Sequence, residues 1–368
     1  MIVALFYYLF LTYINSEIIT IPITNLDGTI PSPKITTYPQ GQCYLPLNTY
    51  ISYSVFWKSY RNIERKENII GEGILELDDN YEAIHYVSGI EFENFVLNKF
   101  HFYIAKEPIW GWEAGISFGY QNDTSFSIVH TLYKEGHINN LQFAFESINN
   151  FYIGGVPDTI NLSNYTYKVK VKANETLPTW GFALNGIKHK GKVYDINTPC
   201  VIHSAVRKMI VSDELYEIMR NSILKENIDN RECSIENTGF NLEQLYLECN
   251  LSNEKRNETI ELNFDGFSIQ MKLGYLFDGK YSLFLTNMVN HRYGNFNGTI
   301  LGVEFVKSMN FMLFNYKDKH IELYSNVFPM KETTFNKNWI LYLIWGNSIL
   351  CMFNLIVLIY ITIRNKYI

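Results

Sequence analysis

Short runs in which apolar and polar residues alternate dominate the middle of the chain and predict a protein built mainly of β-strands. The segments Tyr165–Val171 and Glu258–Phe264 show this period of two, and Asn, Asp and Gly separate such runs. Successive side chains of a strand point to opposite faces, so the pattern suits sheets with one buried face. We therefore expect an all-β fold.

Two segments depart from this period and predict short helices. Thr124–Lys134 and Ser212–Lys225 carry apolar residues three or four positions apart, which places them on one face of a helix. Ser212 is a good N-cap and Glu214 follows it in the first turn. We expect few other helices.

Long apolar stretches occupy both ends of the chain. Met1–Ser16 is too short to span a bilayer comfortably and predicts a signal peptide, with an uncleaved anchor as the alternative because the stretch lacks positive charge. Trp339–Ile363 carries no charged residue and is long enough to cross the hydrocarbon core. We predict a single-pass type I membrane protein with residues 17–338 in the lumen of the secretory pathway or at the cell surface, and with a short cytoplasmic tail at 364–368.

Cysteines and sequons fit an oxidising compartment. Of five cysteines, Cys351 falls within the predicted span, which leaves Cys43, Cys200, Cys233 and Cys249. A bridge between Cys233 and Cys249 would close a short loop and is the pairing we expect, whereas a second bridge stays open. Candidate N-glycosylation sites of the form Asn-x-Ser/Thr lie at Asn122, Asn161, Asn164, Asn174, Asn250, Asn257 and Asn297.

The charge balance argues against nucleic acid as a partner. The formal net charge is -6 and the pI is near 5.8, whereas nucleic-acid-binding domains are usually basic. Lys168, Lys170 and Lys172 share one face of a predicted strand. They form either a small basic patch or a solvated strand face.

Neither a metal site nor a Cys-His catalytic pair is indicated by spacing along the chain, and no cofactor is expected. Cys200 and His203 are three residues apart, so on an extended strand they point to opposite faces. His203 is expected to be hydrogen-bonded rather than a metal ligand. The eight histidines lack zinc-site spacing and lie at His85, His101, His130, His137, His189, His203, His291 and His320.

A series of short sequence blocks, in a fixed order along the chain, resembles the motifs of a known protein family. The blocks are Tyr38–Gln40, Glu113–Tyr120, Phe151–Gly155, Trp180–Gly191, Met209–Met219, and Thr299–Gly302 with Phe305. They resemble segments of pepsin-like aspartic proteases and span about residues 35 to 324. The resemblance implies a bilobal, all-β fold with a cleft between the lobes, and about 310 luminal residues suit two β lobes of similar size.

The same resemblance shows where the chain departs from the family. It aligns Leu47–Tyr50 and Ile202–Ala205 with the two Asp-Thr-Gly motifs, so Asn48 and His203 stand at the positions of the catalytic aspartates. An aspartic protease needs two carboxyl groups that share one proton. A carboxamide cannot transfer that proton, and one imidazole beside an amide lacks the complementary acid.

Neighbouring positions also differ from the family pattern. Thr49 and Ser204 follow the altered positions, but Tyr50 and Ala205 stand where the resemblance implies glycine, so the turns are expected to differ in shape. Ile70 stands where a tyrosine of the substrate-covering flap is expected.

The resemblance and the apolar ends together define the expected organisation. We predict a signal peptide at 1–16, an N-terminal lobe at 17–172, a C-terminal lobe at 173–328, a juxtamembrane linker at 329–338 and a transmembrane helix at 339–363.

Function is expected to follow from the altered positions. The leading interpretation is a catalytically inactive, membrane-anchored protein that holds an extended peptide or protein in the cleft. The alternatives are a divergent hydrolase that uses His203 with an unidentified acid, and a surface adhesion or structural module. The oligomeric state is not predicted.

Overall fold

The computed structural model describes most of the region between the apolar ends. The residues described are 18–26, 30–37, 41–44, 46–50, 54–57, 69–76, 80–92, 95–106, 115–119, 124–147, 149–177, 179–206, 209–237, 245–276, 282–285, 298–332 and 352. Contacts divide the chain into two compact units, residues 1–331 and 332–368. All elements below belong to the first unit except the last residue of β23.

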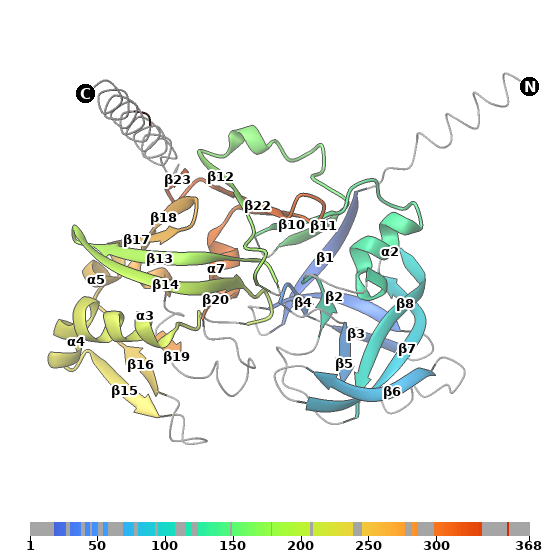
Figure 1. The fold of residues 1–368 in the computed structure, drawn as a ribbon, viewed down its shortest axis with the longest axis horizontal. Coiled ribbons are helices and arrows are strands. Elements are labelled where there is room, and N and C mark those ends of the chain that lie inside the picture. Colours follow the sequence, from blue (N-terminus) through green and yellow to red (C-terminus); the bar gives the residue numbers. More distant parts are fainter. Residues whose placement is uncertain are drawn as a thin grey trace, which may run out of the picture. The chain divides into compact units, whose positions relative to one another are not determined.

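The largest sheet has 12 strands and combines segments from both ends of the folded region (Figure 1). Its path runs through β12 (Tyr167–Lys172), β22 (His320–Ser325), β21 (Phe311–Asn315), β10 (Gln142–Glu146), β11 (Asn150–Ile153), β1 (Ile19–Leu26), β2 (Ile30–Thr37), β7 (Asn80–Phe92), β8 (Val96–Ala105) and β5 (Val55–Trp57). Off this path, β3 (Gly41–Tyr44) pairs with β2 and β6 (Ile69–Glu76) pairs with β7. Because β10 and β21 are antiparallel neighbours, this sheet joins the two halves of the sequence.

Smaller sheets carry the remaining strands. One has the order β20 (Thr299–Leu301), β14 (Lys192–Ile202), β13 (Gly181–His189), β17 (Thr259–Phe264), β18 (Phe267–Lys272) and β23 (Met330–Glu332). Another has the order β15 (Cys233–Asn237), β16 (Leu245–Cys249) and β19 (Ser282–Leu285), and β4 (Leu47–Asn48) pairs with β9 (Ile116–Ser117). The all-β prediction is confirmed.

Sequence alternation explains these strands directly. β12 and β17 coincide within two residues with the two predicted strands, and their apolar residues are buried while their polar ones are partly or fully exposed. Between β13 and β14, Lys190 and Gly191 both have positive φ, 48° and 81°. This two-residue turn matches the twist of the flanking strands and favours glycine at its second position.

Helices are few and short, as predicted. Thr124–Lys134 forms a 3-10 turn, η2 (Thr124–Phe126), followed by α2 (Ile128–Lys134). Ser212 caps α3 (Asp213–Ile218) by accepting a hydrogen bond from the Leu215 amide. The other helices described are η3 (Leu162–Asn164), the π-helix η4 (Met219–Ile223), α4 (Lys225–Asp229), α5 (Asn253–Asn257), η5 (Leu273–Leu276) and α7 (Val303–Ser308).

Aromatic side chains fill the core where the two halves meet. Phe143 of β10 stacks on Phe314 of β21 with ring centroids 4.5 Å apart, and both contact the edge of Trp180. Trp180 is fully buried. A Cβ added at Gly181 would lie 2.3 Å from the Cys200 carbonyl oxygen, so only glycine lets β13 approach β14 this closely beside Trp180.

The cysteine and lysine predictions have separate outcomes. Cys233 and Cys249 form a disulfide between β15 and β16, as predicted, and Cys200 is a free, buried thiol. Within the described part of the chain, Lys170 pairs with Glu322 and Lys172 with Glu175, at 3.1 Å and 2.7 Å. The lysine stripe is therefore a solvated, partly neutralised strand face.

The predicted signal peptide, 1–16, lies outside the described residues, as do the juxtamembrane residues 333–338 and, apart from Met352, the predicted transmembrane helix 339–363. Among the residues that are described, no helix combines the length and apolar character needed to cross a bilayer.

Candidate functional site

Two matching strand pairs position the altered motifs. Leu47 and Asn48 of β4 pair in parallel with Ile116 and Ser117 of β9. In the second half, β14 and β20 pair in parallel, with Ile202 opposite Leu301. The His203 amide then donates to the Leu301 carbonyl. Each half thus presents its tetrapeptide at the end of a strand held by a parallel partner.

Reciprocal hydrogen bonds join the two tetrapeptides across 155 residues of sequence. The Ser204 hydroxyl accepts from the Thr49 amide at 3.1 Å, and the Thr49 hydroxyl accepts from the Ser204 amide at 3.0 Å. Each hydroxyl also donates to a carbonyl, Thr49 to Ile202 at 2.8 Å and Ser204 to Leu47. Leu47, Thr49, Ile202 and Ser204 are all fully buried, so we call this group the Thr49–Ser204 centre.

Further contacts fix the surroundings of this centre. The Thr179 hydroxyl donates to the Thr49 carbonyl. The Phe118 carbonyl accepts hydrogen bonds from the Trp180 indole and the Tyr316 phenol, at 2.6 Å and 2.8 Å. Because Phe118 follows β9 and Trp180 precedes β13, these bonds tie the segments next to both tetrapeptides together.

His203 lies beside the centre with no exposed surface. Its Nδ1 accepts a hydrogen bond from the Ala205 amide at 3.3 Å, which places the ring proton on Nε2. Tyr50 stacks on the imidazole with centroids 4.9 Å apart and planes 10° apart. Burial lowers the pKa of His203 to about 3, because the charged form loses its hydration. The ring is neutral at every pH between mildly acidic and basic.

The other site residues predicted from the sequence lie at different places in the fold. Asn48 ends β4 opposite Ser117, Ala205 is buried in the turn after His203, and Ile70 lies within strand β6 with 57% of its surface exposed. The side chain of Asn48 lies outside the described part of the structure. The segments joined at the centre contain no Asp or Glu; they are residues 46–50, 115–119, 179–180, 201–206 and 298–303.

The fold agrees with a solved structure, although sequence comparison finds no relative. No family model matches the chain, and no curated protein matches it. The crystal structure of the aspartic proteinase from Irpex lacteus superposes with a TM-score of 0.63 at 10% identity, covering 84% of this chain and 97% of that one. This chain has the fold of an aspartic proteinase. At such low identity the likeness establishes the fold and leaves activity to be argued from the site.

Within this fold, the hydrogen bonds that join the two tetrapeptides are distinct from the groups that proton transfer would need. The hydroxyl-to-amide bonds of Thr49 and Ser204 hold the two strand ends in fixed register, although Tyr50 and Ala205 replace the glycines that the resemblance implies. What the segments lack is a pair of groups that can exchange a proton near neutral pH.

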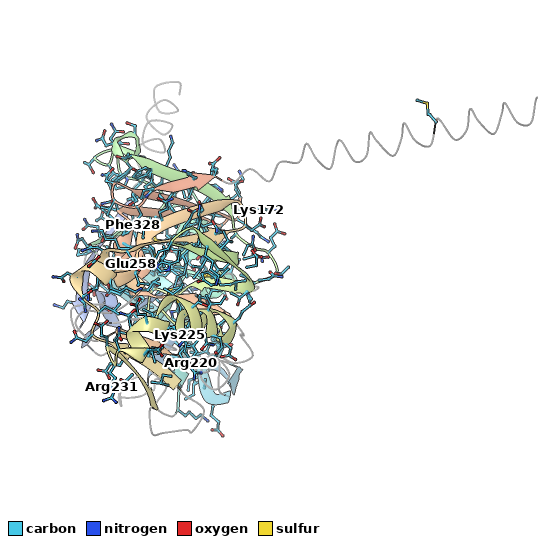
Figure 2. The ribbon with its side chains drawn as sticks, turned by 90° about the vertical axis from the view of Figure 1, so that its left-hand side faces the viewer. Lys172, Arg220, Lys225, Arg231, Glu258 and Phe328 are labelled. Carbon is cyan, nitrogen blue, oxygen red and sulfur yellow. A yellow bond between two sulfur atoms is a disulfide. The ribbon has the colours of Figure 1, made fainter. Side chains whose placement is uncertain are left out.

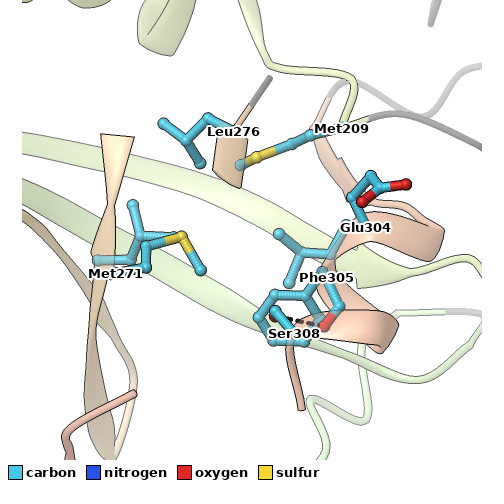
Figure 3. A pocket seen from close by; sticks show the side chains of 8 residues that line it. Met209, Met271, Leu276, Glu304, Phe305 and Ser308 are labelled. Carbon is cyan, nitrogen blue, oxygen red and sulfur yellow. Dashed lines mark hydrogen bonds between the residues drawn. The ribbon is translucent and has the colours of Figure 1, made fainter. Parts of the chain in front are cut away.

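Other candidate sites in the described residues offer no catalytic constellation. Cys200 is fully buried and burial raises the pKa of its thiol, so the thiolate needed for a nucleophile does not form. No group of three or more potential metal-ligating side chains occurs in the part of the chain described. An apolar cavity with a volume of about 10 Å³ is lined by Met209, Leu262, Met271, Leu276, Leu301, Glu304, Phe305 and Ser308, and Figure 3 shows side chains that line it. It offers room for about one water.

Sequence analysis missed a polar cluster around Glu258, labelled in Figure 2. Its carboxylate contacts His189 at 2.8 Å, Lys190 at 2.8 Å and Lys255 at 3.0 Å. Although burial alone would raise its pKa, hydrogen bonds from Lys190, His189 and Lys255 lower the pKa of Glu258 to about 2. Lys255 lies three residues before Glu258 on the chain, whereas His189 and Lys190 are brought to it by the pairing of β13 with β17, which the sequence does not show.

Proposed function

We propose that this protein is a catalytically inactive member of the aspartic proteinase fold that binds an extended peptide or protein between its halves. The observation that carries the absence of catalysis is the burial of His203. It occupies one acid position, has no exposed surface and is covered by Tyr50.

The chemistry of peptide hydrolysis requires a base to take a proton from water and an acid to donate one to the leaving group. With its pKa lowered to about 3, the His203 ring is too weak a base to deprotonate water and carries no extra proton to donate above that pH. Asn48 at the other position supplies an amide, which does neither. The residues present support binding and disfavour turnover.

Binding remains chemically reasonable because it needs no ionisable pair. An extended peptide is held by main-chain hydrogen bonds and by pockets for alternate side chains. The buried bonds of Thr49 and Ser204 give such a site a rigid floor, and rigid sites lose less entropy on binding. Tyr50, half-buried above His203, is the side chain placed to touch a ligand.

A second candidate function is a surface-contact module whose interior is simply packed. The complete burial of His203 under Tyr50 favours it, because a filled centre leaves less room for a ligand. In this case partners contact the outer surface and the halves serve as scaffold.

We further propose that the folded region lies in the secretory pathway or at the cell surface, anchored by one helix at 339–363. Support comes from the apolar composition of that segment and from the Cys233–Cys249 disulfide, which is typical of oxidising compartments. Exposed sequons at Asn161, Asn164, Asn250 and Asn257 are accessible to glycans.

Incubation of the purified full-length chain with a peptide library tests the absence of turnover. From about pH 3.5 to pH 8 we expect no cleavage, with an active aspartic proteinase as positive control. Cleavage that His203→Ala abolishes would overturn the proposal and establish the divergent hydrolase.

Affinity capture from the same library separates the two binding modes. For ligands held between the halves, Tyr50→Ala should change affinity by at least about tenfold, or 1.4 kcal/mol. Val193→Ala, at an exposed position with 54% of its surface accessible, is the matched control. Equal retention by both variants favours the surface-contact module.

Protease protection of vesicles tests the topology. We expect residues 17–338 to be protected from the protease and to shift in gel mobility on glycosidase treatment. Reduction of the Cys233–Cys249 disulfide should also change the mobility of this region. Digestion of the folded region from the cytosolic side would refute the membrane orientation without touching the argument about the site.

A further inference from the structure

Two histidines that are 16 residues apart in sequence meet on one face of the β7–β8 pair. The strands are antiparallel neighbours (Figure 1), with His85 opposite Tyr103 and Val87 opposite His101. His85 and His101 are therefore diagonal neighbours on one face. Their facing nitrogens, His85 Nε2 and His101 Nδ1, lie 3.1 Å apart.

The pair is held in a defined environment. Phe126 of η2 covers it, with centroids 5.0 Å from His85 and 5.8 Å from His101, and stacks on Tyr103 at 5.0 Å. Phe126 is itself 2% exposed, so its ring is fixed. Both histidines are half-buried, and their contacts with Phe126 restrain the rings.

We propose that His85 and His101 form a two-histidine site for a divalent transition metal such as Cu²⁺ or Zn²⁺. Zinc–imidazole bonds of about 2.0 to 2.1 Å at a tetrahedral angle separate two ligand nitrogens by about 3.3 Å. The observed separation of 3.1 Å needs only a small rotation of the rings. The proposal rests on the two imidazoles, because the described residues contain no group of three or more ligands of the usual kinds.

Imidazole as ligand selects the metal class. Neutral imidazole suits Cu²⁺, Ni²⁺ and Zn²⁺ and is a poor ligand for Mg²⁺ or Ca²⁺, and Cu²⁺ binds tightest in this series. Spacing along the chain gave no sign of this site because the two residues are 16 positions apart. Strand pairing alone brings them together, which revises the sequence expectation of no metal.

Proton balance makes binding dependent on pH. In the neutral pair one ring donates and the other accepts, so metal binding requires that the donor ring move its proton to its other nitrogen. At acidic pH, protons on the imidazoles compete directly with the metal and are released when it binds. Affinity should therefore be high at about pH 7.5 and lost at about pH 5.

Electron paramagnetic resonance of Cu²⁺ added to the full-length protein tests the site. The chain is purified with a histidine-free tag and stripped with chelator before titration. We expect one bound ion per chain with two nitrogen ligands at about pH 7.5, and release at about pH 5. A spectrum without nitrogen coupling overturns the proposal, even if every variant misfolds.

Variants assign the ligands. His85→Gln and His101→Gln should each weaken Cu²⁺ binding by at least about tenfold, whereas His137→Gln, at an exposed position, should bind like the wild type. Near-ultraviolet circular dichroism without metal checks the folding of each variant. Equal binding in all three folded variants overturns the assignment.

Discussion

The Thr49–Ser204 centre and the Glu258 cluster solve the problem of buried polar groups in opposite ways. At the centre, neutral hydroxyls and amides are paired reciprocally and no exposed surface remains. Around Glu258, a carboxylate with 19% of its side chain exposed is surrounded by three potential cations. Charged groups therefore occur in the Glu258 cluster, where solvent hydrates them in part, and neutral groups occur at the buried centre.

This difference bears on function. Aspartic proteinases use two acids that share a proton, whereas the bonds of Thr49 and Ser204 here pair neutral groups. The two regions should therefore respond differently to mutation and to acid.

Removal of the Ser204 hydroxyl should have the largest effect. Ser204→Ala leaves the Thr49 amide and the Leu47 carbonyl buried without their partner, and each such group costs about 1 to 3 kcal/mol. We expect a loss of about 3 kcal/mol in the free energy of unfolding, measured by urea titration of the full-length chain. Ser234→Ala, at an exposed position on β15, is the control, and an equal effect there would show that the centre contributes nothing special.

As the pH falls, the free energy of unfolding should decrease first through His203 and only at lower pH through the Glu258 cluster. The pKa of His203 is about 3 in the fold and about 6.5 when unfolded. Between these values the unfolded chain binds the extra proton, so stability is full above pH 6.5 and falls as the pH drops toward 3.

The size of this effect follows from the pKa difference. At about pH 5 the penalty should reach about 2 kcal/mol, and His203→Gln should abolish that part of the pH dependence. Thermal unfolding of both proteins from pH 8 to about pH 4 measures it. Parallel curves would show that His203 is solvated and titrates normally.

The Glu258 cluster should respond over a lower pH range and by less. Glu258→Gln keeps the shape and removes the charge shared by His189, Lys190 and Lys255, for an expected loss of about 1.5 kcal/mol at neutral pH. Because the pKa of Glu258 is lowered to about 2, its contribution is full above the unfolded value of about 4.3. It is lost as the pH falls from there toward 2.

Comparison of wild type and Glu258→Gln by thermal unfolding checks both statements. The gap between the two proteins should be constant above about pH 5 and close below about pH 4. Glu261→Gln on the same strand is a suitable control, since Glu261 contacts Gln270 rather than a cation. A gap that is independent of pH would mean that packing, not charge, holds the cluster.

Sequence alone predicted the strands and the two main helices, because alternation and caps are local. The period of β12 and the cap at Ser212 required no tertiary information. Also predicted was the disulfide of Cys233, because the loop that it closes is short.

Contacts that depend on strand register were beyond such analysis. The stacking of Tyr50 on His203 joins two residues that are 153 positions apart in the sequence. The His85–His101 contact likewise follows from antiparallel pairing. Periodicity says that a residue faces inward or outward, but it does not say which distant residue it meets.

The smallest expected effect separates rim charges from buried ones within the Glu258 cluster. Lys190 lies in the hairpin turn with 63% of its side chain exposed, whereas Lys255 is 11% exposed and also donates to the Ile223 carbonyl at 3.2 Å. Exposed ion pairs contribute about 0.2 to 1 kcal/mol and are screened by salt. Lys190→Ala should therefore lower the free energy of unfolding by about 0.3 kcal/mol, and less in concentrated salt. Lys255→Ala should cost about 1.5 kcal/mol with little dependence on salt, because the loss of its ammonium removes one of the three partners of the Glu258 carboxylate and takes a donor from the Ile223 carbonyl. Equal losses for both variants in a urea titration would mean that the stability contributed by each lysine does not depend on its exposure. The proposed difference between exposed and buried charges would then be wrong.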